Sequence, residues 1–405
     1  MLQFMDLTRT RHSSGRPYQE GKKTVKRNDL SISTAFSALI ASVVFVGVAF
    51  AQDPSPTPVS SPRTSVGGFE VTSSIELGVR GLEVNGNHEK YRSDLNYRAG
   101  FRVFDSSFLI EDKTIGGVKL FDTAQVITSG FGSDPSGVFR FNLDKTGLYK
   151  FESNIRRVKY FNFLNNHAAP EPVIGRPRGQ HNFNTVHNFG DFDLTIFPER
   201  QSLRFRLGAS FNDTKGPATY TTRFQGDEFE VQSNVDTESM DFRAGVDGKV
   251  LGFNLGVTYG HRRFTDNTSY FQEPSLGNSS APNTASIDSF RRDYPIKGTT
   301  NFVHFNAQRT FAEKLDFTGR FIYSLSNTEF GLNEIYTGRG QNGVFIDLDQ
   351  FNIFGDAKRP QSRGDIGATY RVTDRFRISD TFTFDQFNIS GGNELLEVII
   401  RRTVA

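Results

Sequence analysis

The chain has 405 residues, with 41 Phe, 12 Tyr, no Cys, no Trp and a formal net charge of +2. The absence of cysteine excludes disulfides, lipidation at cysteine, thiolate metal sites and covalent attachment of c-type haem. The charge gives no reason to expect nucleic-acid binding, because a basic N-terminal segment supplies more than the excess. We predict no cofactor.

Residues 1–51 have the pattern of a cleaved signal peptide. Basic residues such as Arg9, Lys22 and Lys26 precede an apolar run at 35–50, which ends in Ala49-Phe50-Ala51. This run is shorter than the roughly 20 residues that a membrane-spanning helix needs. Residues 52–68, rich in Pro and Ser, are predicted to be a periplasmic linker.

From residue 69 the chain alternates apolar with polar residues, as in Leu251–Gly260. A two-residue period is typical of β-strands that have one face in contact with water. After a bacterial export signal, repeated strands of this kind indicate an all-β fold: a transmembrane antiparallel up-and-down β-barrel of the outer membrane, over residues 69–390. About thirteen strands are expected, within a range of about 12–14. Their predicted ranges are 69–83, 91–110, 118–130, 137–143, 148–160, 188–197, 201–213, 237–247, 250–264, 300–310, 314–328, 362–372 and 376–388.

Short and long connections alternate between these strands. Polar turns are predicted at 112–117, 144–147, 197–200, 246–249, 311–314 and 373–375, and long loops at 162–186, 213–236, 266–299 and 328–363. In single-chain outer-membrane barrels the periplasmic turns are short and the external loops are long. The same asymmetry is therefore expected here.

The last predicted strand ends on the side opposite to the start of the first. Residues 391–405 lose the alternation and form an atypical C-terminal tail. Because bacterial single-chain barrels have an even number of strands, two interpretations stay open. Either the count is wrong by one strand, or the chain is part of a larger barrel and does not close alone.

One segment carries a family resemblance. It runs from Gly81 to Phe108 and contains Asn87-His88-Glu89-Lys90-Tyr91-Arg92-Ser93-Asp94, and it continues in Gly147–Phe151 and Arg156–Phe161. These residues resemble the N-terminal part of the MtrB/PioB family of outer-membrane β-barrel proteins. The resemblance implies a barrel that sheathes a periplasmic multihaem cytochrome and lets electrons cross the membrane.

Alternation also predicts which charged residues line the lumen. The inward set contains more bases than acids, the acids being Glu70, Glu76, Glu152, Asp241 and Asp316. A basic lining would favour anions, whereas mutually screened, solvated charges are the alternative interpretation. The candidate lumen-lining basic residues are Arg98, Arg102, Arg140, Arg156, Arg204, Arg206, Arg243, Arg320 and Arg377.

No metal site and no enzyme are predicted. His167, His181 and His187 lie in or beside one loop, but their spacing matches no ligand template. No Gly-x-Ser-x-Gly nucleophile motif is present.

Two functions stay open: a porin-like sheath that houses or docks a periplasmic multihaem cytochrome for electron transfer, and a diffusion porin or uptake channel for small, including anionic, solutes. Both imply outer-membrane lipid and the barrel assembly machinery as partners, with no nucleic acid.

Overall fold

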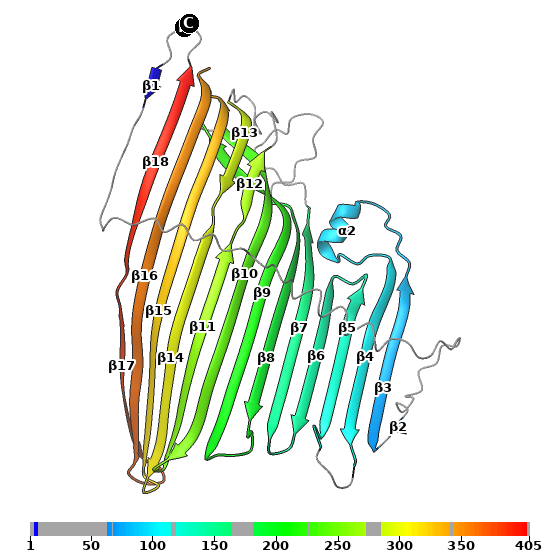
Figure 1. Ribbon diagram of the computed structural model, residues 1–405, viewed down its shortest axis with the longest axis vertical. Coiled ribbons are helices and arrows are strands. Elements are labelled where there is room, and N and C mark those ends of the chain that lie inside the picture. Colours follow the sequence, from blue (N-terminus) through cyan, green and yellow to red (C-terminus); the bar gives the residue numbers. More distant parts are fainter. Residues whose placement is uncertain are drawn as a thin grey trace. The chain divides into compact units, whose positions relative to one another are not determined.

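The computed structural model describes residues 4–6, 63–66, 68–114, 119–163, 181–225, 227–272, 285–340 and 343–402. The predicted signal peptide and linker lie mostly outside these ranges. Within them the chain forms β-strands and one helix, α2 (His88–Asp94), and the strands belong to a single antiparallel sheet (Figure 1). The predicted all-β, antiparallel class is confirmed.

The first half of the sheet is a series of hairpins in which each strand pairs with the next. Its strands are β2 (Arg63–Val66), β3 (Phe69–Arg80), β4 (Gly100–Asp112), β5 (Thr123–Gly132), β6 (Ser136–Lys145), β7 (Tyr149–Asn162), β8 (Phe183–Ile196), β9 (Leu203–Phe224) and β10 (Asp227–Val250).

The second half contains three strand paths that are each made of two strands. β11 (Phe253–Asp266) continues into β12 (Ser269–Gln272), β13 (Ser286–Asp293) continues into β14 (Ile296–Phe311), and β17 (Arg377–Phe387) continues into β18 (Ser390–Arg402). Between them lie β15 (Leu315–Arg339) and β16 (Phe345–Arg371), and both β17 and β18 pair with β16. The short β1 (Phe4–Asp6) pairs with β18.

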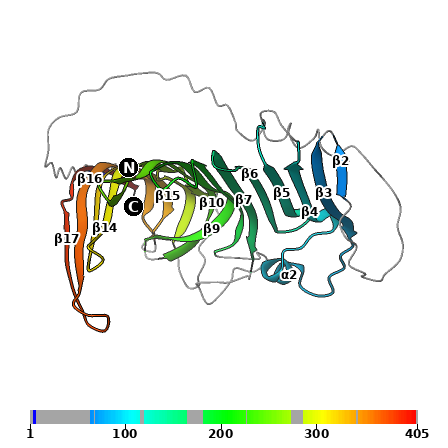
Figure 2. The same cartoon turned by 90° about the horizontal axis from the view of Figure 1, so that it is seen from below.

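Every predicted strand range overlaps an observed strand. Among the described residues, residue-by-residue pairing runs from β2 on one side to β17 and β18 on the other, and Figures 1 and 2 show β3 and β17 at opposite sides of the sheet. β3 and β17 run in the same direction, as the odd number of strand paths predicted from residue 69 requires. β2, which was not among the predicted strands, adds one antiparallel strand beyond β3.

Four sequence predictions differ from the structure. Residues 63–66, inside the predicted linker 52–68, form β2 and pair with β3. Residues 88–94 are helical, so the strand predicted at 91–110 begins only at Gly100. The described residues of 213–236 and 328–363, predicted as loops, are the extended ends of β9, β10, β15 and β16. The loop predicted at 266–299 contains β12, β13 and the start of β14. The tail predicted at 391–405 lies largely in β18, which pairs with Phe345–Lys358 of β16. These pairings satisfy backbone groups that a loop would leave to water.

The sheet has one apolar face and one polar face in the half that carries the short turns, here called the turn half. Leu207, Phe242, Val257, Phe305 and Phe321 are exposed, and the pairing register places them on the same face. This is the apolar face. The opposite face presents polar and charged residues, so the alternation predicted from the sequence is present on neighbouring strands in register.

In the other half of the long strands, here called the cap half, the apolar side chains change faces. In β9 the apolar positions are Leu203, Phe205 and Leu207 in the turn half, but Tyr220 and Phe224 in the cap half. Since successive side chains point to opposite faces, the change from odd to even numbers is a change of face. β15 changes in the same way, from its odd positions at 315–325 to Phe330, Leu332 and Tyr336.

The cap half contains a buried cluster of apolar side chains. Its members come from β9, β10, β13, β15 and β16 and the residue before β13. They are Phe224, Phe229, Val231, Ala285, Ile287, Phe290, Tyr336 and Ile346. The rings of Phe224 and Tyr336 stack with centroids 5.2 Å apart, although three strand paths separate β9 from β15 in the sheet. The sheet therefore curls upon its own polar-face side in this half and buries a core there.

Candidate functional site

The polar face in the turn half is lined by charged side chains that pair across neighbouring strands. Asp247 of β10 accepts hydrogen bonds from Arg204 Nη2 at 3.0 Å and Arg206 Nη2 at 2.8 Å, both on β9. Arg320 of β15 donates to Asp365 of β16 at 2.8 Å. Since these partners lie on adjacent strands, the register of the hairpins sets the pairs.

All the predicted lumen-lining arginines except Arg98 are on strands, and the register places each of them on this polar face. Arg98 lies in the connection between α2 and β4. Arg243 lies 3.7 Å from Asp193, and Arg156 is stacked over the ring of Phe189. Arg140 of β6 and Arg377 of β17 are on the same face.

The acids that pair with these arginines are mostly not those expected from the sequence. Asp193, Asp247 and Asp365 lie on the same face as their arginine partners. The polar face therefore carries compensated charge rather than a row of isolated cations. Cross-strand neighbours of this kind depend on register, which the spacing of residues along one strand does not give.

A further cluster is buried near the loop end of β3 and β4. The carboxylate of Asp134, whose side chain is 5 % exposed, lies between the guanidinium groups of Arg80, at 2.7 Å, and Arg102. Arg80 also stacks over Tyr97, and Arg102 over Phe104. Two cations around one carboxylate leave one positive charge, and the aromatic faces stabilise it.

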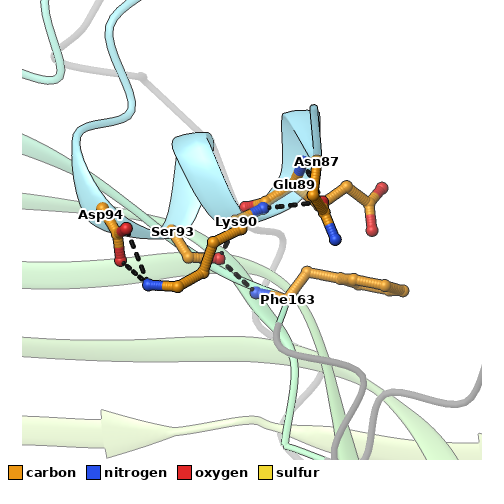
Figure 3. Close-up of polar contacts among 6 residues, drawn as sticks. All are labelled: Asn87, Glu89, Lys90, Ser93, Asp94 and Phe163. Carbon is orange, nitrogen blue, oxygen red and sulfur yellow. Dashed lines mark hydrogen bonds and ion pairs between the residues drawn. The ribbon is translucent and has the colours of Figure 1, made fainter. Parts of the chain in front are cut away.

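The segment that carries the family resemblance forms α2, shown in Figure 3. Asn87 caps the helix, because its side-chain oxygen accepts from the backbone N–H groups of Glu89 at 2.9 Å and Lys90 at 3.0 Å. Ser93 Oγ accepts a hydrogen bond from the backbone N–H of Phe163 at 2.9 Å, which ties the helix to the end of β7 (Figure 3).

The cap half has its own polar pair beside the apolar core. Arg292 of β13 forms an ion pair with Glu334 of β15, and Arg292 Nη2 donates to Tyr336 Oη at 3.4 Å. Burial raises the pKa of Tyr336 to about 12. Asp349 of β16 is 7 % exposed, and its Oδ1 has no hydrogen-bond partner among the described residues.

The histidines do not form a metal site in the described part of the chain. His187 is hydrogen-bonded through both ring nitrogens, to Thr214 at 3.0 Å and Thr185 at 3.1 Å. His167 lies outside the described residues. Among the described residues, no group of three or more His, Asp or Glu side chains could hold a metal ion. Within the same residues, no helix is long and apolar enough to cross a membrane.

No protein-family model and no curated protein matches this chain.

Proposed function

We propose that this chain forms the wall of an outer-membrane β-barrel, a porin-like sheath that houses or docks a periplasmic multihaem cytochrome for electron transfer across the membrane. One observation carries the membrane part of the proposal. Long antiparallel strands present exposed Leu, Val, Phe and Tyr side chains on one face and charged side chains on the other. In water such a surface is unfavourable, whereas lipid on the apolar face and water on the polar face suit it.

The apolar band also has the length that a membrane requires. In β15 the apolar-face positions run from Leu315 to Leu325 before the polarity changes. A membrane strand needs about 9–11 residues. The cap half then lies outside the bilayer, where a buried core on the polar-face side and a hydrophilic opposite face are compatible with water.

The sheath role rests on the resemblance of Gly81–Phe108 to the MtrB/PioB family. The compensated charge on the polar face agrees with it, because a wall of paired ions surrounds a protein partner without strong selection for one sign of charge. The same lining also suits a diffusion channel for small solutes, including anions, which is the second candidate function.

The membrane part is tested by a pair of neighbouring substitutions in β11. Val257 is on the apolar face and Thr258 on the polar face. Val257→Arg should destabilise the refolded protein in vesicles by about 2–4 kcal/mol, and Thr258→Arg by much less. Equal losses in urea titrations would mean that the apolar face does not contact lipid.

The two candidate functions are separated by conductance and cytochrome binding. Purified protein is placed in planar bilayers with and without a periplasmic multihaem cytochrome on the turn side. A sheath binds the cytochrome, and the bound cytochrome lowers the conductance. A steady conductance with no cytochrome binding favours the channel, and no conductance in either case contradicts both.

A further inference from the structure

A group of cations that form no ion pair with any described carboxylate lies where α2 meets the end of β7. It consists of Arg92 on α2, Arg98 in the connection to β4, and Arg157 and Lys159 on β7. We call it the α2–β7 cation cluster. Asn96 Nδ2 donates to the carbonyl of Lys159 at 2.9 Å, and the guanidinium of Arg92 lies 3.6 Å from the ring centre of Phe161. These contacts bring the two segments together.

Two acids near this cluster are engaged elsewhere, and a third, Glu89, acts on Arg92 from the same helix without forming an ion pair with it. Asp94 pairs with Lys90 at 2.5 Å, and Asp134 pairs with Arg80 and Arg102. Among the described residues, no carboxylate forms an ion pair with any member of the cluster. Neighbouring like charges repel one another.

The effect is visible in two members. Burial, followed by repulsion from Arg157 and Arg98, lowers the pKa of Lys159. Burial and then Arg98 lower the pKa of Arg92, and Glu89 opposes this shift. An anion bound among these groups would relieve the repulsion.

The position of the cluster points to a particular anion. On β7 the apolar-face positions are Tyr149, Phe151 and Ile155, and the next positions of the same alternation are Arg157 and Lys159. If the apolar band lies in the bilayer, these two cations lie at the level of the lipid headgroups on the loop side. This step rests on the proposed function.

We propose that the α2–β7 cation cluster binds the phosphate groups of a phosphorylated glycolipid in the outer leaflet. Arg and Lys bind phosphate through charge-assisted hydrogen bonds, and cations near a lipid surface each contribute about 1 kcal/mol to binding of anionic headgroups. The apolar residues of β7 beside the cluster would contact the acyl chains of the same lipid.

The test measures lipid binding in detergent micelles, where neither a pore nor a cytochrome is needed. The probes are lipid A with two phosphates, the same lipid without phosphates, inorganic pyrophosphate and polyglutamate. Wild-type protein should bind the phosphorylated lipid, and Arg157→Gln/Lys159→Gln should bind it about 25-fold more weakly, about fivefold for each cation removed. Arg98→Gln, in a connection outside the sheet, gives an independent reduction of about fivefold.

Lys215→Gln is the matched control. Lys215 has the same apolar-face parity in β9 beyond the apolar band, but it already pairs with Asp236 at 3.4 Å. Its loss should leave lipid binding unchanged. Equal weakening in the control and the cluster variants, or equal binding of the dephosphorylated lipid, would overturn the proposal. So would stronger binding of pyrophosphate or of polyglutamate than of the phosphorylated lipid, because the ligand would then be a free phosphate or an acidic protein.

Failure of this proposal can be told apart from failure of the proposed function. A protein that conducts or binds cytochrome but ignores lipid phosphate refutes only the lipid site. A protein that binds the phosphorylated lipid but tolerates Val257→Arg as well as Thr258→Arg refutes only the membrane wall.

Discussion

Gly190 in β8 provides a sharp test of side-chain packing on the apolar face. The ring of Phe211, directly opposite on β9, lies over this glycine, and an added Cβ would be 2.1 Å from Phe211 Cε1 and 2.7 Å from Cδ1 and Cζ. The same ring stacks on Phe192 with centroids 6.2 Å apart. Gly190→Ala must therefore displace a ring that already has a partner.

The expected cost combines two effects. Alanine in a strand gains about 0.5–1 kcal/mol over glycine, and overpacking costs about 1–3 kcal/mol. We expect Gly190→Ala to lower the free energy of unfolding by about 1–2 kcal/mol, measured by urea titration of the refolded protein with the β-sheet circular dichroism band.

The matched control is Gly319→Ala, on the apolar face of β15. There an added Cβ would be 3.7 Å from the nearest atom, which belongs to Phe317. This variant should be neutral or slightly stabilising. In a Phe211→Leu background the Gly190→Ala cost should shrink, because the ring is absent. An unchanged cost in that background, or an equal cost at Gly319, would refute the reasoning.

Three further predictions concern α2 and the cap half. Asn87→Ala should cost about 1 kcal/mol of local stability, seen as faster hydrogen exchange at the amides of Glu89 and Lys90, whereas unchanged exchange would contradict the capping role. Glu334→Leu removes the carboxylate partner of Arg292 beside the core and should cost about 3 kcal/mol in urea titrations monitored by proteolysis of the cap; a neutral result would show that the pair is dispensable. Burial, then Glu397, raises the pKa of Asp349 to about 6, so the folded protein holds this proton more tightly than the unfolded chain and stability should fall as pH rises from about 4 to 6. Asp349→Asn should therefore stabilise the protein at pH 7.5 and have little effect at pH 4, and an equal effect at both would contradict the assignment.

Much of the sheet could be predicted from alternation alone. Leu203–Phe211 and Leu315–Tyr323 are long enough for the two-residue period to identify a strand and its apolar face. The strands of the cap half are not predicted by this pattern, because Phe229 and Val231 have the opposite parity from Phe242 in the same strand. A pattern search that assumes one apolar face along the whole strand therefore assigns the segment around Phe229 and Val231 to a loop.

The helix and the ion pairs could not be predicted for different reasons. Tyr91 and Leu95 continue an alternating pattern, but the Asn87 cap and the Lys90–Asp94 pair favour a helical turn. The partner of Arg204 depends on which residue of β10 lies opposite, and a shift by one residue would replace Asp247 with Val246 or Gly248. Register is a property of two strands together, so one strand's sequence does not contain it.

The change of face along β9 and β15 also constrains how the length of these strands can vary. In β9 the apolar side chains of the turn half occupy odd positions up to Phe211, and those of the cap core occupy even positions from Tyr220. The alternation in the cap half is therefore shifted by one residue relative to that in the turn half. A single inserted or deleted residue between Asn212 and Thr219 would bring both parts into the same phase and turn the cap residues Thr222 and Phe224 away from their core. A change of two residues would preserve the phase. Length variation in this segment should therefore be tolerated in steps of two, or be compensated by a bulge.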